Sequence, residues 1–95
     1  MISSARISTT APSALIRRLC KHWGHKFPVN YDEEHGDVQL SKGRCVMQVV
    51  DDALQVQLEA ASDDDLQHLE RVVADHLQRM AGKDETLTFA WHRPA

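Results

Sequence analysis

Apolar residues recur at helical spacing in two parts of the chain. The first stripe runs from Ser13 to Trp23 and comprises Leu15, Ile16, Leu19, Cys20 and Trp23. The second follows Ser62 and comprises Leu66, Leu69, Val73, Leu77 and Met80. Ser62 and Asp65 have the spacing of a capping box, and Gly24 and Gly82 stand where helices commonly end. Each stripe predicts a helix that buries one face.

Elsewhere the apolar residues alternate with polar ones, which is typical of half-buried strands. The predicted strands are 3–8, 27–31, 38–40, 45–49, 54–60 and 86–91. Polar stretches at 32–37, 41–43 and 51–53 have turn chemistry and join the middle strands closely. The expected order is therefore β-α-β-β-β-β-α-β.

This order predicts an α+β two-layer sandwich, with a mainly antiparallel sheet and both helices packed on one face. Residues 1–95 are expected to form a single domain. The outer sheet face would present Gln39, Gln48, Gln55, Gln57, Glu59 and Thr88, with Val46 and Val50 as apolar exceptions. Such a face suits a monomer in water or a weak homodimer.

Charge and targeting signals narrow the class of protein. The net charge of −3 gives no basic field for nucleic acid. The opening residues lack the apolar segment of a secretory signal, and no stretch is long enough to span a membrane. We therefore expect a cytoplasmic protein without nucleic-acid or membrane partners. Cys20 and Cys45 are expected to be reduced, buried thiols.

The densest group of chemically versatile side chains is CKHWGHKF, residues 20–27. On a helix Cys20 and His22 lie about 160° apart, so they cannot bind one metal ion together. His22 and His25 could do so if Gly24 turns the chain back. A third ligand would then have to come from His35, His76 or His92.

The same segment is also a candidate ligand-binding site. Trp23 and Phe27 belong to the core or to the lip of a pocket beside Gly24. The candidate ligand-binding residues are His22, Trp23, His25, Lys26 and Phe27. Arg17, Arg18, Lys21 and Lys26 could receive an anion or an acidic partner, or simply face solvent. No residue is assigned a catalytic role, because Cys20 is expected to pack rather than react.

Four segments, LCKHWGHKFPV, GRCVMQV, LQVQLEA and DLQHLERVVADHLQRMAGKDETLTFAW, resemble the bacterial family called domain of unknown function 2218. The resemblance runs from about Ala5 to Arg93. Members occur alone or fused to siderophore-interacting proteins, which are flavin-dependent ferric-siderophore reductases. The resemblance implies a link to iron acquisition, with a siderophore-related small molecule or a siderophore-interacting reductase as partner.

The chain itself carries no flavin or nicotinamide fingerprint, so it is not expected to be the reductase. No cofactor is required by the sequence. The leading hypothesis is a non-enzymatic accessory domain that binds a ligand or partner near His22 to Phe27. The alternatives are a transition-metal-binding protein that uses His22 and His25, a structural or dimerisation module, and a small enzyme with a Cys or His as acid or base.

Overall fold

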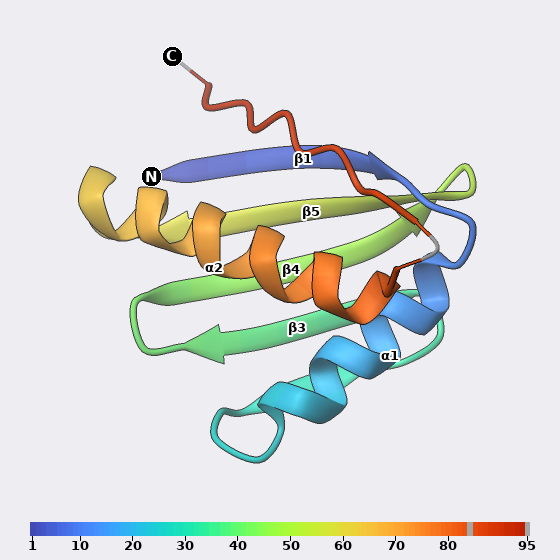
Figure 1. Ribbon diagram of the computed structural model, residues 1–95. Coiled ribbons are helices and arrows are strands. Elements are labelled where there is room, and N and C mark those ends of the chain that lie inside the picture. Colours follow the sequence, from blue (N-terminus) through green and yellow to red (C-terminus); the bar gives the residue numbers. More distant parts are fainter. Residues whose placement is uncertain (84, 95) are drawn as a thin grey trace.

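Strands and helices form two separate layers (Figure 1). The computed structural model describes residues 1–83 and 85–94. The strands are β1 (Ile2–Ser8), β2 (Val29–Tyr31), β3 (His35–Leu40), β4 (Gly43–Val50) and β5 (Ala53–Ala60). The helices are α1 (Pro12–Trp23) and α2 (Asp63–Ala81).

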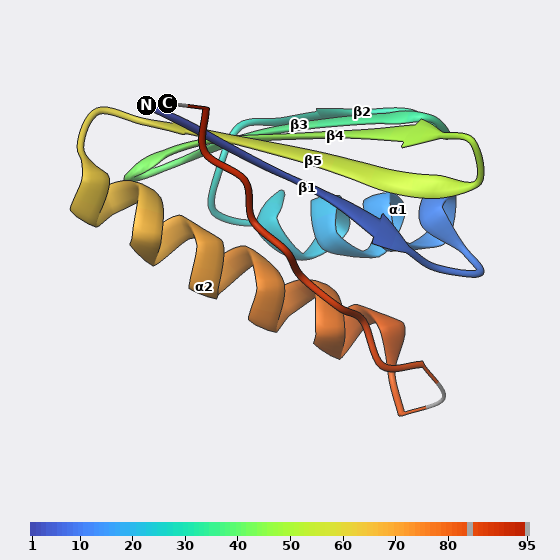
Figure 2. The same cartoon turned by 90° about the horizontal axis from the view of Figure 1, so that it is seen from above.

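The strands form one sheet in the order β1-β5-β4-β3-β2, and each neighbouring pair is antiparallel. Seen along the sheet, both helices lie on the same side of it and leave the other face open (Figure 2). The predicted α+β sandwich is therefore confirmed, including the placement of both helices.

The core lies between the sheet and the two helices, where the predicted apolar faces meet. From β5, Leu54, Val56 and Leu58 are fully buried. The helices contribute Leu15, Ile16, Leu19, Cys20, Trp23, Leu66, Leu69, Val73 and Leu77. Burial of these side chains is the main stabilising term of a domain this small, at roughly 25 cal/mol for each Å² of apolar surface.

The ends of the helices show how local chemistry sets their limits. The Ser62 hydroxyl accepts a hydrogen bond from the Asp65 N–H at 3.1 Å, so the predicted cap of α2 is confirmed. Gly82 follows α2 with φ of +80°. Gly24 also ends its helix, but with φ of −61°, so it does not use the left-handed conformation expected of a C′ glycine.

Several strand boundaries differ from the predicted ones: Gly43 and Ala53, expected in turns, belong to β4 and β5, and β2 starts at Val29 rather than at Phe27. The largest difference is at β3. Residues 35–37, expected in a turn, belong to β3. The reason is a tight turn at 32–34, in which Asp32 Oδ1 accepts the N–H groups of Glu34 and His35, both at 2.8 Å. β3 can therefore start at His35 and pair with β4 from its first residue.

The final predicted strand, 86–91, does not join the sheet. Residues 86–91 have no regular secondary structure, and His92, which follows them, forms an isolated bridge with Ser4 of β1. The Gln78 side chain instead binds the start of the segment: its Nε2 donates to the Glu85 carbonyl and its Oε1 accepts from the Leu87 N–H, both at 2.8 Å. The segment still turns its apolar side inward, since Leu87 is buried.

The open face of the sheet is polar, as expected. Gln39, Gln48, Gln57 and Glu59 are exposed there, and Val46 and Val50 are half-buried. Thr88 lies outside the sheet, so its predicted place on this face is wrong. Asp37 and Arg44, which come from neighbouring strands, form a two-bond ion pair on the face.

Candidate functional site

The end of α1 folds the chain back on itself. The Trp23 carbonyl accepts hydrogen bonds from the N–H groups of Lys26 at 3.0 Å and Phe27 at 2.9 Å. The Cys20 carbonyl accepts the Gly24 N–H at 2.8 Å. A Cβ at Gly24 would lie 3.0 Å from that carbonyl oxygen, so the turn favours glycine through close approach. The turn brings His25 and Lys26 beside the last turn of α1.

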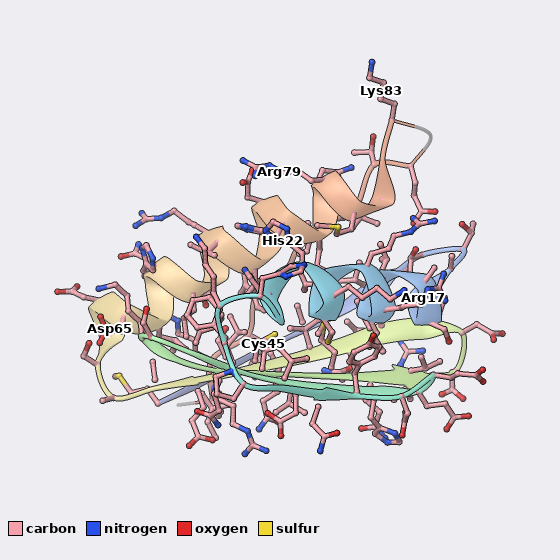
Figure 3. All side chains as sticks on the ribbon, turned by 90° about the horizontal axis from the view of Figure 1, so that it is seen from below. Arg17, His22, Cys45, Asp65, Arg79 and Lys83 are labelled. Carbon is pink, nitrogen blue, oxygen red and sulfur yellow. The ribbon has the colours of Figure 1, made fainter. Side chains whose placement is uncertain are left out.

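A cavity of about 320 Å³ lies against this turn, and we call it the histidine cavity. Its lining residues are His22, Trp23, His25, Lys26, Phe27 and His76. The five predicted ligand-binding residues are thus brought together around one hollow, and α2 adds a sixth residue. Figure 3 shows His22 on α1 beside α2.

His76 connects the two helices inside this cavity. Its ring centroid lies 5.1 Å from that of Trp23 and 5.4 Å from that of His22. His76 Nδ1 is 2.7 Å from the Val72 carbonyl oxygen. Because a carbonyl only accepts, Nδ1 carries the proton of this hydrogen bond. In the neutral ring, Nε2 is then the nitrogen with a lone pair available to a ligand.

A second cavity of about 180 Å³ is also lined by Trp23 and Phe27, and we call it the leucine cavity. Its remaining lining residues are Leu40, Ser41, Lys42, His68, Leu69 and Val72. The turn between β3 and β4 and the first half of α2 supply them. Trp23 is 5% exposed and forms part of the wall of both cavities.

The three candidate third ligands for a metal are separated by the fold. His76 lines the histidine cavity, whereas His35 lies on β3 with its Nδ1 3.4 Å from Asp32 Oδ1. His92 lies at the bridge to β1. Within residues 1–83 and 85–94, no group of three or more His, Cys, Asp or Glu side chains is arranged to hold a metal ion.

Both cysteines are buried free thiols, as predicted. Burial, and secondarily the negative charge of Asp37, raises the pKa of Cys20 to about 11. Burial likewise raises the pKa of Cys45 far above its ordinary value. Neither position provides the accessible thiolate that a nucleophilic mechanism needs. The predicted separation of Cys20 from His22 is confirmed, because His22 is exposed.

The four basic residues of the α1 region do not lie together. Lys26 lines the histidine cavity. Arg18 reaches the end of α2, where its Nη1 donates to the Met80 carbonyl at 2.8 Å. Arg17 and Lys21 are exposed on α1 and line neither cavity. The four cations therefore do not form one anion site.

A hollow on the open sheet face is lined in part by Asp32, His35 and Asp37, whose charged groups already have partners within the protein. Arg44 holds the pKa of Asp37 below its usual range through their hydrogen bonds. The backbone N–H groups of Glu34 and His35 do the same for Asp32. These internal partners make this hollow a weaker ligand site than the histidine cavity.

Of the α2 residues that line the two cavities, the sequence pointed only to His76, as a candidate metal ligand, and did not place His68 or Val72 there. His68, Val72 and His76 are spaced four residues apart and so lie along one side of that helix. This spacing was a usable signal for a shared face. It does not say which neighbour the face meets, and that is settled by the way α2 packs on α1 and on β5 and β4.

An antiparallel five-stranded sheet, two helices on one face and a histidine-lined cavity at the end of α1 define a small α+β sandwich domain. The chain belongs to the bacterial family described as uncharacterized protein conserved in bacteria (DUF2218), whose pattern matches residues 4–92. This confirms the resemblance seen in the sequence.

A solved relative has the same fold. The NMR structure of PA4090 from Pseudomonas aeruginosa is 38% identical, with a TM-score of 0.79 over 96% of this chain and 94% of that one. No curated protein matches the chain. Among the described residues, neither helix has the length and apolar content needed to cross a membrane.

Proposed function

We propose that this chain is a non-enzymatic accessory domain that binds a small ligand in the histidine cavity. One observation carries the proposal: His22, Trp23, His25, Lys26 and Phe27 line a single hollow together with His76 of α2. Aromatic surface beside a few polar groups is the usual composition of a small-molecule site.

Binding is favoured over catalysis by what surrounds the imidazoles. An acid–base or nucleophilic mechanism needs a base that a third group orients. Among the described residues that line the histidine cavity, none is Asp or Glu. His76 is oriented instead by the Val72 carbonyl, which fixes its tautomer without a charged partner. The two thiols are buried in the core.

The proposed biological setting is iron acquisition. Its support is the resemblance to a family whose members also occur fused to siderophore-interacting reductases. The proposed ligand is a ferric siderophore, and the proposed partner is such a reductase. Lys26 and the three imidazoles would meet the polar groups of the ligand, while Trp23 and Phe27 would meet its apolar parts.

A ligand screen tests this function. Purified protein is mixed with ferric siderophores, iron(III), haem or flavins and followed by thermal shift and by absorbance. We expect at least one ferric siderophore to raise the melting temperature and Lys26→Ala to reduce that shift. Lys83→Ala is the matched control, since Lys83 projects from the chain beyond α2 (Figure 3). An intact, folded sample that responds to none of these compounds contradicts the proposed function.

A second candidate function, binding of a transition metal, is favoured by the geometry of His76. Two imidazoles on one tetrahedral ion with ~2.0 Å metal–nitrogen bonds have ring centroids about 5 Å apart. The His22 and His76 centroids are 5.4 Å apart. The Val72 carbonyl gives His76 the support that metal-binding histidines commonly have. His25 would supply the third ligand after a shift of its turn.

Elemental analysis and zinc or iron(II) titration of untagged protein test this alternative. We expect stoichiometric metal that is lost in His76→Ala and retained in His68→Ala, which removes an imidazole from the same helix. Protein that contains no metal and takes up none contradicts it.

A further inference from the structure

We infer that the histidine and leucine cavities are two halves of one site, and that its ligand is an organic anion with a flat apolar body, such as an aromatic carboxylate. This rests on the proposed function and adds the chemical class of the ligand. The anionic group would lie against His22, His25 and Lys26, and the ring system would extend past Trp23 toward Leu40 and Val72.

The two cavities share a wall. Trp23 and Phe27 line both of them. Phe27 is only half-buried and follows the turn that closes α1. Val72 lines the leucine cavity, and its carbonyl holds His76 in the histidine cavity. A ligand that rests on the Trp23 and Phe27 rings would therefore contact both halves.

The charged side chains that line the two cavities favour an anionic ligand. The chain has 14 acidic and 11 basic residues, so a surface taken at random would carry carboxylates. Among the described residues that line either cavity, none is Asp or Glu, whereas two are Lys and four are His. Such a lining favours an anion over a cation or a neutral amide.

The anionic group of the ligand would lie at the Lys26 end of the site. Lys42, in the leucine cavity, lies 3.6 Å from Asp65, so its charge is partly balanced. Among the ion pairs of the described residues, none involves Lys26. The helix dipole of α1 would oppose an anion here, but the Cys20 and Trp23 carbonyls already accept backbone N–H groups of the turn. The uncompensated positive charge is thus at the Lys26 end.

The leucine cavity is the apolar half of the site, and its walls suit a flat ring. The Trp23 ring, the Phe27 ring and the aliphatic side chains of Leu40, Leu69 and Val72 form its apolar walls. Aromatic surfaces of this kind contact flat rings by offset stacking or edge-to-face packing. A flat ring system therefore fits the leucine cavity better than a compact, strongly hydrated ion such as phosphate.

A ¹⁵N NMR titration with three probes tests the inference: 2-naphthoate, its neutral amide 2-naphthamide, and acetate. We expect 2-naphthoate to shift amide signals of both halves, including Lys26 and Val72. Acetate should bind more weakly and shift only signals near Lys26, and 2-naphthamide should bind at least fivefold more weakly than the acid. Equal affinity for acid and amide overturns the charge argument, and shifts confined to one half overturn the two-part site.

Two pairs of variants test each half of the site separately. Lys26→Gln should weaken 2-naphthoate binding roughly fivefold or more, while Lys83→Gln should not. Val72→Phe fills the leucine cavity and should abolish the preference for 2-naphthoate over acetate, while Val50→Phe, on the open sheet face, should leave it unchanged. If both members of a pair behave alike, the assignment of that half is wrong.

The outcomes also separate this inference from the proposed function. Ferric siderophores that bind the histidine cavity while 2-naphthoate does not would overturn the inference alone. Binding of 2-naphthoate with no response to any iron compound would overturn the iron-linked function and support the inference. No response to either set would contradict both.

Discussion

At the scale of single residues, Gly43 is the glycine at which an added Cβ would be most crowded. A Cβ there would lie 2.1 Å from the Glu59 carbonyl oxygen and 2.7 Å from Leu69 Cδ1. Backbone on the neighbouring strand cannot move aside without breaking the pairing of Gly43 with Ala60. We therefore expect Gly43→Ala to lower the free energy of unfolding by about 3 kcal/mol, measured by urea denaturation.

Gly36→Ala is the matched comparison for that variant. A Cβ at Gly36 would come within 3.0 to 3.1 Å of the side chains of Ile16, Cys20 and Met47. Side chains can shift by a few tenths of an ångström, so the expected loss is only about 1 kcal/mol. Equal losses in the two variants would contradict the distinction between backbone and side-chain crowding.

The residue scale is also where the sequence was most informative about the site. His22 to Phe27 are near neighbours in the chain, so a single turn at Gly24 was enough to gather them. His76 was named only as one of three candidate ligands, because periodicity identifies the buried side of a helix but not the helix that packs on it. Lys42 and His68 carried no local signal that would place them beside Trp23.

At the scale of elements, an ion-pair cluster fastens α2 to the end of the chain and to β1. Glu70 receives bonds from Arg93 at 2.9 and 3.2 Å and from the Ser3 hydroxyl at 2.6 Å. Arg93 also pairs with Asp63. The Arg93 hydrogen bonds, more than the Ser3 bond, hold the pKa of Glu70 below its usual range, although partial burial opposes them.

The direction of this pKa shift predicts how the cluster responds to acid. A carboxylate with a lowered folded-state pKa stabilises the protein above its unfolded pKa, and that contribution disappears as the pH falls through the folded value. Glu70→Gln should lower the free energy of unfolding at pH 7 by about 1–2 kcal/mol. By pH 3 the difference from the parent protein should be smaller.

Urea denaturation at a series of pH values measures this dependence. Glu33→Gln, in the exposed turn before β3, controls for the loss of a carboxylate as such. A Glu70→Gln penalty that stays constant from pH 7 to pH 3 would mean that the ionised carboxylate is not what the cluster requires.

Gln78 fastens the same C-terminal segment at its other end. Its amide bonds the Glu85 carbonyl and the Leu87 N–H, and Leu87 is buried. Gln78→Ala would leave these backbone groups without that partner, so we expect a loss of about 1–2 kcal/mol in unfolding free energy. Gln67→Ala, at an exposed position of α2, should change it by less than about 0.5 kcal/mol. A similar effect of both variants would contradict the role of Gln78 as a clamp.

These elements explain why the fold was largely predictable and its last segment was not. Apolar stripes and apolar–polar alternation arise because a whole face of each helix or strand is buried. These patterns therefore predicted both helices and the middle strands. The segment 86–91 has the same alternation, because Leu87, Phe89 and Trp91 also pack against the core. Alternation indicates that one side of the segment is buried, but it does not say whether the backbone pairs with a strand; here the Leu87 N–H binds the Gln78 side chain.

At the scale of the whole molecule, the histidine and leucine cavities are lined by α1 and the turn after it, by the end of β3 and the turn after it, and by α2, whereas β4 and β5 line neither. β4 and β5 each have a strand on both sides, whereas β2 is a three-residue edge strand. Amides of β4 and β5 should therefore exchange with solvent mainly through global unfolding, and those in the last turn of α2 through local fraying.

This difference gives a test of ligand binding that does not depend on contacts at the site. A ligand that binds only the folded state stabilises it by about 2.7 kcal/mol at a free concentration of one hundred times its dissociation constant. Under that condition 2-naphthoate should slow exchange of the β4 and β5 amides by about a hundredfold, although these strands do not line either cavity. Exchange of the amides of residues 79–81, which open by fraying, should be unchanged, since their opening leaves the site intact.

Hydrogen exchange followed by NMR measures both groups of amides in one sample. Equal slowing in β4 and β5 and in residues 79–81 would show that the probe acts on the whole surface or on the solvent. Unchanged exchange in β4 and β5 would show that 2-naphthoate does not bind the folded state selectively.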